Sequence, residues 1–116
     1  MELKSVGIIG VGSYKPSKVM SNSDLEKMVD TSNEWIVSRT GIEERRIAEE
    51  NESTSDLAYK AAIKALGNAK VNAEDLDLII VATMTPDYFT PATAALVQNK
   101  LGAKKAAAFD LSSACS

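Results

Sequence analysis

An almost uninterrupted apolar run at residues 76–83, LDLIIVAT, limits the possible folds of this chain more than any other segment. A strand with one face in water alternates apolar and polar residues, and this run does not. Such runs are typical of strands that are covered on both faces, as in parallel sheets. Parallel strands need helical crossovers, so the run predicts a chain in which strands and helices alternate.

The segments on both sides of this run fit that alternation. Residues 53–67 predict an Ala-rich helix that begins with a capping-box pair of Ser53 and Asp56 and ends near its glycine. Residues 90–102 predict a second helix with proline at its first position and glycine at its end. Residues 106–111 then predict another strand, which gives a layered α/β domain with a largely parallel sheet.

The amino-terminal segment also has a strand pattern. Residues 6–11 are apolar apart from their glycines, which predicts a buried strand. Gly10 and Gly12 invite comparison with a dinucleotide-binding fingerprint, but the third glycine is missing and Pro16 stands where the helix would begin. The two glycines instead indicate a tight, closely packed turn.

Between these segments the pattern predicts short elements. Residues 22–30 predict a helix capped by Asn22 or Ser23, and residues 45–48 predict a short edge strand in a region dense in charge.

A further helix, over residues 31–41, carries side chains suited to a nucleotide. Thr31 and Glu34 form its capping box. Thr31, Trp35 and Arg39 are spaced at i, i+4 and i+8, so they are expected to line one face. A hydroxyl, a flat ring and a planar cation together suit a nucleotide with phosphate groups. Taken singly, such residues are more often an N-cap, a core or interface ring and a solvated charge.

Composition excludes several classes of function. A net charge of −3 argues against nucleic-acid binding, which needs clustered basic residues in excess. One cysteine and no histidine exclude an internal disulfide and the usual Cys/His zinc sites, so no metal is expected. The longest apolar run is far short of the ~20 residues that cross a bilayer. The first four residues, MELK, lead directly into a strand pattern, without the basic region, long apolar region and cleavage site of a signal peptide. We therefore expect a cytoplasmic protein with no membrane role.

Cys115, the single cysteine, follows a predicted strand and would lie at the start of whatever helix continues the chain. There the helix dipole and free backbone N–H groups favour a thiolate and can form an oxyanion hole for an acyl thioester. The alternative is a small, buried packing thiol. A thiol nucleophile generally has a histidine partner, and this chain supplies none.

The loop at residues 84–91 is polar and aromatic and follows a predicted core strand. It would lie at the carboxyl edge of the sheet, where α/β proteins tend to bind ligands. A role as an interface loop is equally compatible with this composition.

Four strings resemble β-ketoacyl-acyl carrier protein synthase III in order and spacing. They are GVGSYKP (residues 10–16), DTSNEWI (30–36), RTGI (39–42) and FDLSSACS (109–116). The resemblance implies an α/β fold, namely the N-terminal half of a thiolase-like fold, with a mixed, mostly parallel sheet and flanking helices. Residues 1–116 would then be an incomplete N-terminal thiolase-like domain that ends at the nucleophile, with the C-terminal half absent.

The resemblance further implies an initiating condensing enzyme of type II fatty acid synthesis. Such an enzyme joins an acyl-CoA primer to malonyl-acyl carrier protein with loss of carbon dioxide, through an acyl-cysteine intermediate. Cys115 would take the acyl group, Trp35 would stack on the adenine of CoA, and Arg39 and Thr31 would lie near its nucleotide and phosphates. Thr90 would be offered across a dimer interface to the primer pocket. No cofactor is implied, since the coenzyme A thioester is a substrate.

The remaining parts of such a site are implied to lie in the second half. They are the catalytic His and Asn and the basic surface that docks the acyl carrier protein, so the chain alone is expected to be inactive and the complete enzyme to be a homodimer. Two alternatives remain open: a related hydroxymethylglutaryl-CoA or polyketide-type condensing enzyme, and a non-catalytic CoA-binding or interaction module.

Overall fold

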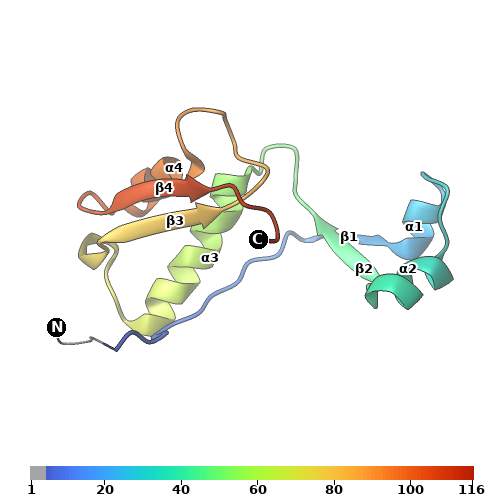
Figure 1. The fold of residues 1–116 in the computed structure, drawn as a ribbon, viewed down its shortest axis with the longest axis horizontal. Helices are drawn as coiled ribbons and strands as arrows, with labels where there is room; N and C mark the ends of the chain where they lie inside the picture. The colour runs from blue at the N-terminus through green and yellow to red at the C-terminus, as the bar shows by residue number, and fades with distance from the viewer. Residues whose placement is uncertain (1–4) are drawn as a thin grey trace. The chain divides into compact units, whose positions relative to one another are not determined.

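The computed structural model describes residues 5–116, which form two compact units (Figure 1). The first, here called the sheet unit, consists of residues 5–14 and 53–116. The second, the hairpin unit, consists of residues 15–52. Each unit is described separately below.

The sheet unit contains a parallel pair of strands joined through a helix. Its elements in chain order are α3 (Thr54–Ala69), a 3-10 turn (Ala73–Asp75), β3 (Leu78–Ala82), α4 (Thr93–Leu101) and β4 (Ala107–Leu111). The two strands pair in register from Leu78 opposite Ala107 to Ala82 opposite Leu111. Helix α4 connects them and packs on both strands and on α3 (Figure 1). This β–α–β arrangement confirms the parallel pairing that the apolar run predicts.

Local hydrogen bonds set the start of α3 and the end of α4. Ser53 caps α3 and forms the predicted capping box with Asp56, whereas the helix continues two residues beyond Gly67 to Ala69. Helix α4 ends as predicted at Gly102, which has a left-handed φ of 73°.

The start of α4 differs from the prediction. The helix begins at Thr93, and Pro91 lies before it in a cis peptide bond with Thr90. The physical reason is the carboxylate of Asp110, whose two oxygens accept hydrogen bonds from the backbone N–H groups of Thr93 and Ala94, each at 2.7 Å. These are donors of a first helical turn, which otherwise lack partners, so the carboxylate fixes where the helix starts.

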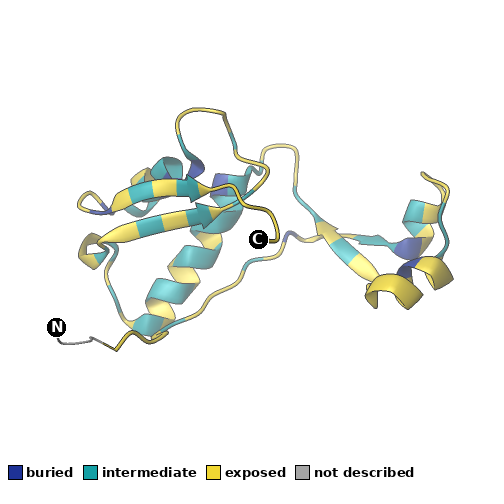
Figure 2. Cartoon of the chain, in the orientation of Figure 1, coloured by how far each residue is buried: buried dark blue, intermediate teal, exposed yellow. Residues whose placement is uncertain are grey.

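The sheet is covered on one face within the described chain. Burial alternates along both strands, as the alternating colours in Figure 2 show. Ile79 and Val81 are half-buried, whereas Leu78 and Ile80 are about half exposed, as are Phe109 and Leu111 on β4. The prediction that residues 76–83 are covered on both faces is therefore wrong for residues 5–116, because α4 covers one side of the pair and no described element covers the other.

Residues 6–11 are extended but form no strand, and Val6, Ile8, Ile9 and Val11 are exposed. A strand requires a neighbouring strand edge for its hydrogen bonds, and within residues 5–116 neither β3 nor β4 pairs with this segment. The predicted buried strand is therefore wrong.

The predicted close packing at the glycines of this segment is confirmed, although no turn forms there. The backbone runs against α3, so that a Cβ atom on Gly10 would lie 2.6 Å from Cβ of Ala69. A Cβ atom on Gly12 would lie 2.3 Å from the backbone nitrogen of Ala65. Asn68 of α3 also donates a hydrogen bond to the carbonyl of Val11 at 2.7 Å.

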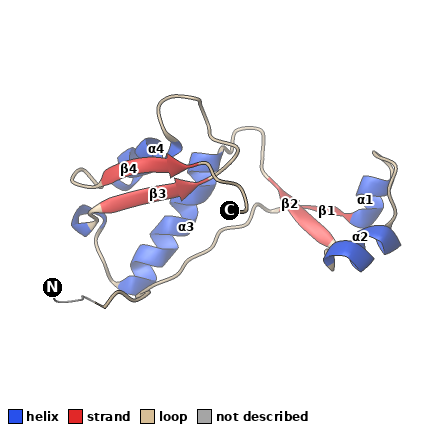
Figure 3. Ribbon diagram, viewed as in Figure 1, coloured by secondary structure: helices blue, strands red, loops and turns tan. Residues whose placement is uncertain are grey.

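The hairpin unit consists of two short strands and two short helices (Figure 3). They are β1 (Lys18–Ser21), α1 (Asn22–Glu26), α2 (Asn33–Thr40) and β2 (Glu44–Ile47). The strands pair antiparallel, from Lys18 opposite Ile47 to Ser21 opposite Glu44. The predicted edge strand is confirmed one residue earlier than expected, whereas β1 was not predicted.

Both N-caps of this unit differ from the predicted residues. Ser21, not Asn22 or Ser23, caps α1 and forms a capping box with Asp24, and the helix ends at Glu26, before residue 30. Ser32, not Thr31, caps α2, and its hydroxyl accepts from the backbone N–H of Trp35 at 3.2 Å. Neighbouring Ser, Asn and Thr residues are nearly equivalent caps, so tertiary contacts decide among them. Gly41 ends α2 with a left-handed φ of 69°, as predicted.

Buried residues are few in both units. The buried apolar residues are Pro16 and Ile36 in the hairpin unit and Ala94, Val97, Ala103 and Ala106 in the sheet unit. Asn22, Ser55 and Thr93 are buried polar residues. Among residues 5–116, none of the helices has the length and apolar character needed to cross a membrane.

Candidate functional site

Cys115 is exposed and lines a pocket of about 510 Å³ at the carboxyl ends of β3 and β4. We call it the thiol pocket; it is lined by Ala82, Thr83, Met84, Leu111, Ser113, Ala114, Cys115 and Ser116. The carboxyl ends of parallel strands are where α/β sheets tend to bind ligands. The thiol is exposed within residues 5–116, and the two interpretations of Cys115, as a nucleophile and as a packing residue, both stay predictions.

Two contacts hold the strand ends of the thiol pocket together. The backbone N–H of Thr83 donates to the carbonyl of Leu111 at 3.2 Å, which extends the parallel ladder by one bond. The hydroxyl of Ser112 donates to the sulfur of Met84 at 3.3 Å. These contacts fix the strand ends from which the segment with Cys115 continues, four residues beyond the end of β4.

The chain turns sharply at the thiol. Ala114 has a left-handed φ of 48°, and the backbone N–H of Ser116 donates to the carbonyl of Ser113 at 3.0 Å. The sequence predicts a helix that starts at this point, and the described chain has a single turn there. The effect of a helix dipole on the thiol therefore stays a prediction.

The loop between β3 and α4 is anchored to the start of α3. The carboxylate of Asp87 accepts from the backbone N–H of Ser55 at 2.8 Å. The backbone N–H of Asp87 donates to the hydroxyl of Thr93 at 3.2 Å. The hydroxyl of Thr54 donates to the carbonyl of Thr85 at 2.6 Å. Thr90 is exposed on this loop and is not among the residues that line the thiol pocket.

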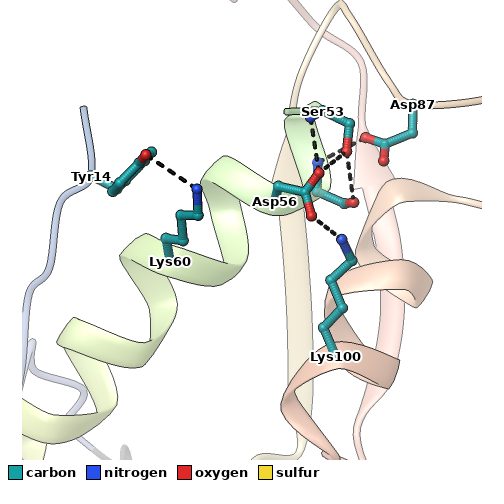
Figure 4. A network of polar contacts seen from close by, with 7 residues as sticks. Tyr14, Ser53, Asp56, Lys60, Asp87 and Lys100 are labelled. Carbon is teal, nitrogen blue, oxygen red and sulfur yellow. Dashed lines mark hydrogen bonds and ion pairs between the residues drawn. The ribbon is translucent and has the colours of Figure 1, made fainter. Parts of the chain in front are cut away.

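A charged network extends these anchors across α3 and α4 (Figure 4). Lys100 of α4 forms an ion pair with Asp56, and that carboxylate also accepts from the backbone and hydroxyl of Ser53 at 2.9 and 2.7 Å. The hydrogen bond from Lys100 and those from Ser53 hold the pKa of Asp56 far below its ordinary value of 3.8.

The pKa of Asp87 is also lowered. Burial alone would raise the pKa of this carboxyl, but the hydrogen bonds from Ser55 and Ser53 lower it by more. Further along α3, the amine of Lys60 donates to the hydroxyl of Tyr14 at 3.2 Å and lies 4.5 Å from the centre of the Tyr14 ring (Figure 4).

The expected nucleotide-contacting residues lie in the hairpin unit. Trp35 is 59% exposed, and the guanidinium carbon of Arg39 lies 6.0 Å from the centre of its ring. Trp35 lines a pocket of about 360 Å³ together with Asp30, Thr31 and Ser32. We call Thr31, Trp35 and Arg39 the tryptophan face.

The structure corrects the predicted geometry of the tryptophan face. Thr31 precedes α2, so the three residues do not share one helical face at i, i+4 and i+8. Thr31 is nevertheless close to Trp35, because both line the same pocket. Asp30 and Ser32 also line it and were not predicted as site residues; their signal was their position beside Thr31 in the sequence.

The predicted site residues fall into two groups. Thr31, Trp35 and Arg39 belong to the hairpin unit, and Thr90 and Cys115 belong to the sheet unit. Across residues 5–116, no group of three or more Cys, Asp or Glu side chains is arranged to hold a metal ion.

Comparison with curated proteins gives a strong match to one group. No protein-family model matches the chain. The chain is 63% identical over 111 residues to a β-ketoacyl-[acyl-carrier-protein] synthase III of Desulfitobacterium hafniense, which covers 96% of this chain and 34% of the relative. The chain thus spans about a third of the length of the curated relatives that it matches.

Solved structures agree with the sequence matches. The 3-oxoacyl-[acyl-carrier-protein] synthase III of Aquifex aeolicus superposes with a TM-score of 0.88 at 57% identity, over 94% of this chain and 35% of that one. The priming β-ketosynthase of the R1128 polyketide biosynthetic pathway superposes with a TM-score of 0.87 at 42% identity, over 93% of this chain and 32% of that one. The predicted resemblance and the predicted thiolase-like α/β fold class are therefore confirmed.

Proposed function

We propose that this chain is the N-terminal part of a β-ketoacyl-[acyl-carrier-protein] synthase III, the enzyme that starts type II fatty acid synthesis. The observation that carries the proposal is the exposed Cys115 at the carboxyl ends of two parallel strands, in a chain 63% identical to such a synthase. The substrates are an acyl-CoA primer and malonyl-acyl carrier protein.

Cys115 is the acyl acceptor in this proposal. Its thiolate attacks the carbonyl carbon of the acyl-CoA, the bond between that carbon and the CoA sulfur breaks, and CoA leaves as the thiol after protonation. The carbanion that forms when the malonyl group loses carbon dioxide then attacks the acyl carbon, the bond between that carbon and the Cys115 sulfur breaks, and the free thiolate is regenerated. The thiol pocket supports this role, because it leaves the sulfur open to a substrate.

The tryptophan face binds the nucleotide end of the primer. The exposed ring of Trp35 offers a platform for the adenine, with Arg39 6.0 Å from its centre and Thr31 in the adjoining pocket. The positive charge of Arg39 suits the phosphates of CoA. No further cofactor takes part, since coenzyme A arrives as the substrate.

The rest of the active site comes from residues beyond this third of the enzyme. A histidine and an asparagine there promote decarboxylation, and a basic surface there docks the acyl carrier protein. The complete cytoplasmic enzyme is a homodimer, in which Thr90 on the exposed loop faces the partner's primer pocket. The 116-residue chain alone does not condense substrates.

Acyl transfer to the thiol tests this function directly. The full-length protein that carries these residues is mixed with acyl-CoA, and its mass is measured before and after digestion. We expect the mass of one acyl group on the peptide that contains Cys115, and no acylation of a Cys115→Ser variant. Acylation that persists in this variant, or a parent protein that takes up no acyl group, contradicts the proposal.

A priming synthase of a polyketide pathway is the second candidate. The superposition on the R1128 priming ketosynthase favours it, although at a lower sequence identity than the fatty acid enzyme. Both candidates acylate Cys115, so the acyl carrier protein distinguishes them. Faster condensation with a polyketide carrier protein than with the fatty acid carrier protein would select the second candidate.

A further inference from the structure

Helix α2 carries Trp35 and Arg39 but has little apolar packing of its own. Its eight residues bury a single side chain, that of Ile36. Helices of this length are unstable in isolation, because nucleation costs more than a few hydrogen bonds return. The direction in which the tryptophan face points must therefore be fixed by contacts outside the helix.

The side-chain amide of Asn22 contacts the residues at both ends of α2. It is 2% exposed, and its Nδ2 donates to Oδ1 of Asn33 at 3.0 Å and to the carbonyl of Ile42 at 2.8 Å. Asn33 is the first residue of α2, and Ile42 follows its C-cap, Gly41. One buried amide thus holds the two ends of the helix at once.

The other side of the same amide is held by the strands. Oδ1 of Asn22 accepts from Nη2 of Arg45 at 2.7 Å, and Nη1 of Arg45 donates to the carbonyl of Met20 at 3.1 Å. The backbone N–H of Asn22 donates to the carbonyl of Glu43 at 3.0 Å. Strands β1 and β2 therefore form the base on which the amide, and through it α2, is fixed.

The partners also determine that an amide is needed at this position. Nδ2 faces two oxygen acceptors, and Oδ1 faces a cation. An aspartate here would keep the contact with Arg45 but would turn an oxygen toward the carbonyl of Ile42, which cannot donate. The buried side chain of Asn22 would lose this hydrogen bond and would place a negatively charged oxygen against the carbonyl of Ile42, so the isosteric change is expected to release the end of α2.

We infer that Asn22 is a positioning residue for CoA recognition, which sets the orientation of Trp35 and Arg39 without touching the substrate itself. This inference rests on the proposed function. It predicts that changes at Asn22 weaken recognition of the nucleotide end of acyl-CoA and leave the chemistry at Cys115 unaffected.

The test compares an acyl-CoA with the matching acyl-pantetheine, which has the same reactive thioester but lacks the adenosine nucleotide. In the full-length enzyme, Asn22→Asp is expected to lower kcat/KM for acyl-CoA roughly tenfold, through a higher KM, since the buried side chain at position 22 loses its hydrogen bond to Ile42. The kcat/KM for acyl-pantetheine is expected to stay unchanged. Asn51→Asp, the same chemical change at an exposed site in the hairpin unit, is expected to affect neither substrate.

A second variant covers the case in which Asn22→Asp does not fold. Asn33→Ala removes the exposed partner of the amide at the start of α2, and it is expected to cause a smaller loss that is again confined to acyl-CoA. An equal loss with both substrates would make Asn22 merely structural, and no loss with either would show that the helix keeps its position without the amide. Either result overturns the inference.

Trp35→Ala separates this inference from the proposed function. Suppose that Trp35→Ala lowers kcat/KM for acyl-CoA but not for acyl-pantetheine, and that the Asn22 and Asn33 variants lower neither. The proposed CoA contact of the tryptophan face then stands, and the inference about Asn22 is wrong. If Trp35→Ala affects both substrates alike, the proposed CoA contact itself is wrong, and the inference that rests on it is overturned too.

Discussion

Gly12 lies where the backbone of the amino-terminal segment meets the backbone of α3. A Cβ atom there would come within 2.3 Å of the Ala65 nitrogen and 2.5 Å of the Ala61 carbonyl oxygen, and neither backbone atom can move without shifting the helix. We expect Gly12→Ala to lower the free energy of unfolding by about 1–3 kcal/mol, as other overpacked sites do. Urea unfolding of the full-length protein measures this.

Gly67 provides the matched control for that change. It lies inside α3, and among residues 5–116 a Cβ atom on it would meet nothing within 4 Å. Gly67→Ala is therefore expected to raise the free energy of unfolding by roughly 0.5–1 kcal/mol, because alanine is a better helix former. Similar effects of the two alanines would contradict the close approach at Gly12.

At the scale of single residues, the sequence predicted local packing better than it predicted contacts between distant residues. The close packing of Gly10 and Gly12 was predictable from their position in an apolar segment. The burial of Asn22 was not, because a residue in a run of Ser and Asn is equally suited to cap a helix. Its role depends on Ile42 and Arg45, which lie about twenty residues away in the chain.

The amino-terminal end of α3 is expected to make folding sensitive to acid. The pKa of Asp56 in the folded chain lies below its ordinary value of 3.8, as does that of Asp87. The unfolded chain therefore binds protons at a higher pH than the folded one. The stabilisation by these carboxylates is complete well above pH 3.8 and is lost as the pH falls toward the lowered values.

Asp56→Asn tests this expectation. At pH 7 the variant should be less stable than the parent, because it loses the ion pair with Lys100. The difference between the two melting temperatures should shrink as the pH falls from about 5 to about 2. Glu50→Gln, an exposed change outside the network, should show no such trend. A difference in melting temperature between parent and Asp56→Asn that did not change with pH would mean that the charge of Asp56 contributes nothing to stability.

At the scale of elements, local signals located the helices and β2, β3 and β4. Capping boxes, terminal glycines and apolar runs are properties of neighbouring residues, so they are visible in a sequence. Residues 6–11 and 18–21 show the limit of such signals. The first segment has a strand pattern but no partner edge in the described chain, and the second is a strand because Lys18 to Ser21 pair with β2.

Both units expose large apolar side chains, and large clusters of such side chains are uncommon on the surface of an independent protein. The open face of the parallel sheet carries Leu78, Ile80, Phe109 and Leu111, and the amino-terminal segment adds Val6 and Ile8. We expect the isolated 116-residue chain to self-associate and to bind a dye that reports apolar surface.

Size-exclusion chromatography checks that expectation against the mass of 12.4 kDa for a single chain. The full-length protein should elute as a defined species and bind little dye. A monodisperse isolated chain that melts cooperatively would contradict the expectation. It would favour the alternative of an independent CoA-binding or interaction module.

The open sheet face has a consequence during protein synthesis. If the proposed function is correct, this chain is the first third of its protein to leave the ribosome, and a remainder about twice as long follows. At roughly 5–20 residues per second, that takes on the order of 10–40 s. Throughout this interval β3 and β4 present a row of apolar side chains to the cell, which makes the nascent chain a natural client for chaperones that bind hydrophobic segments during translation.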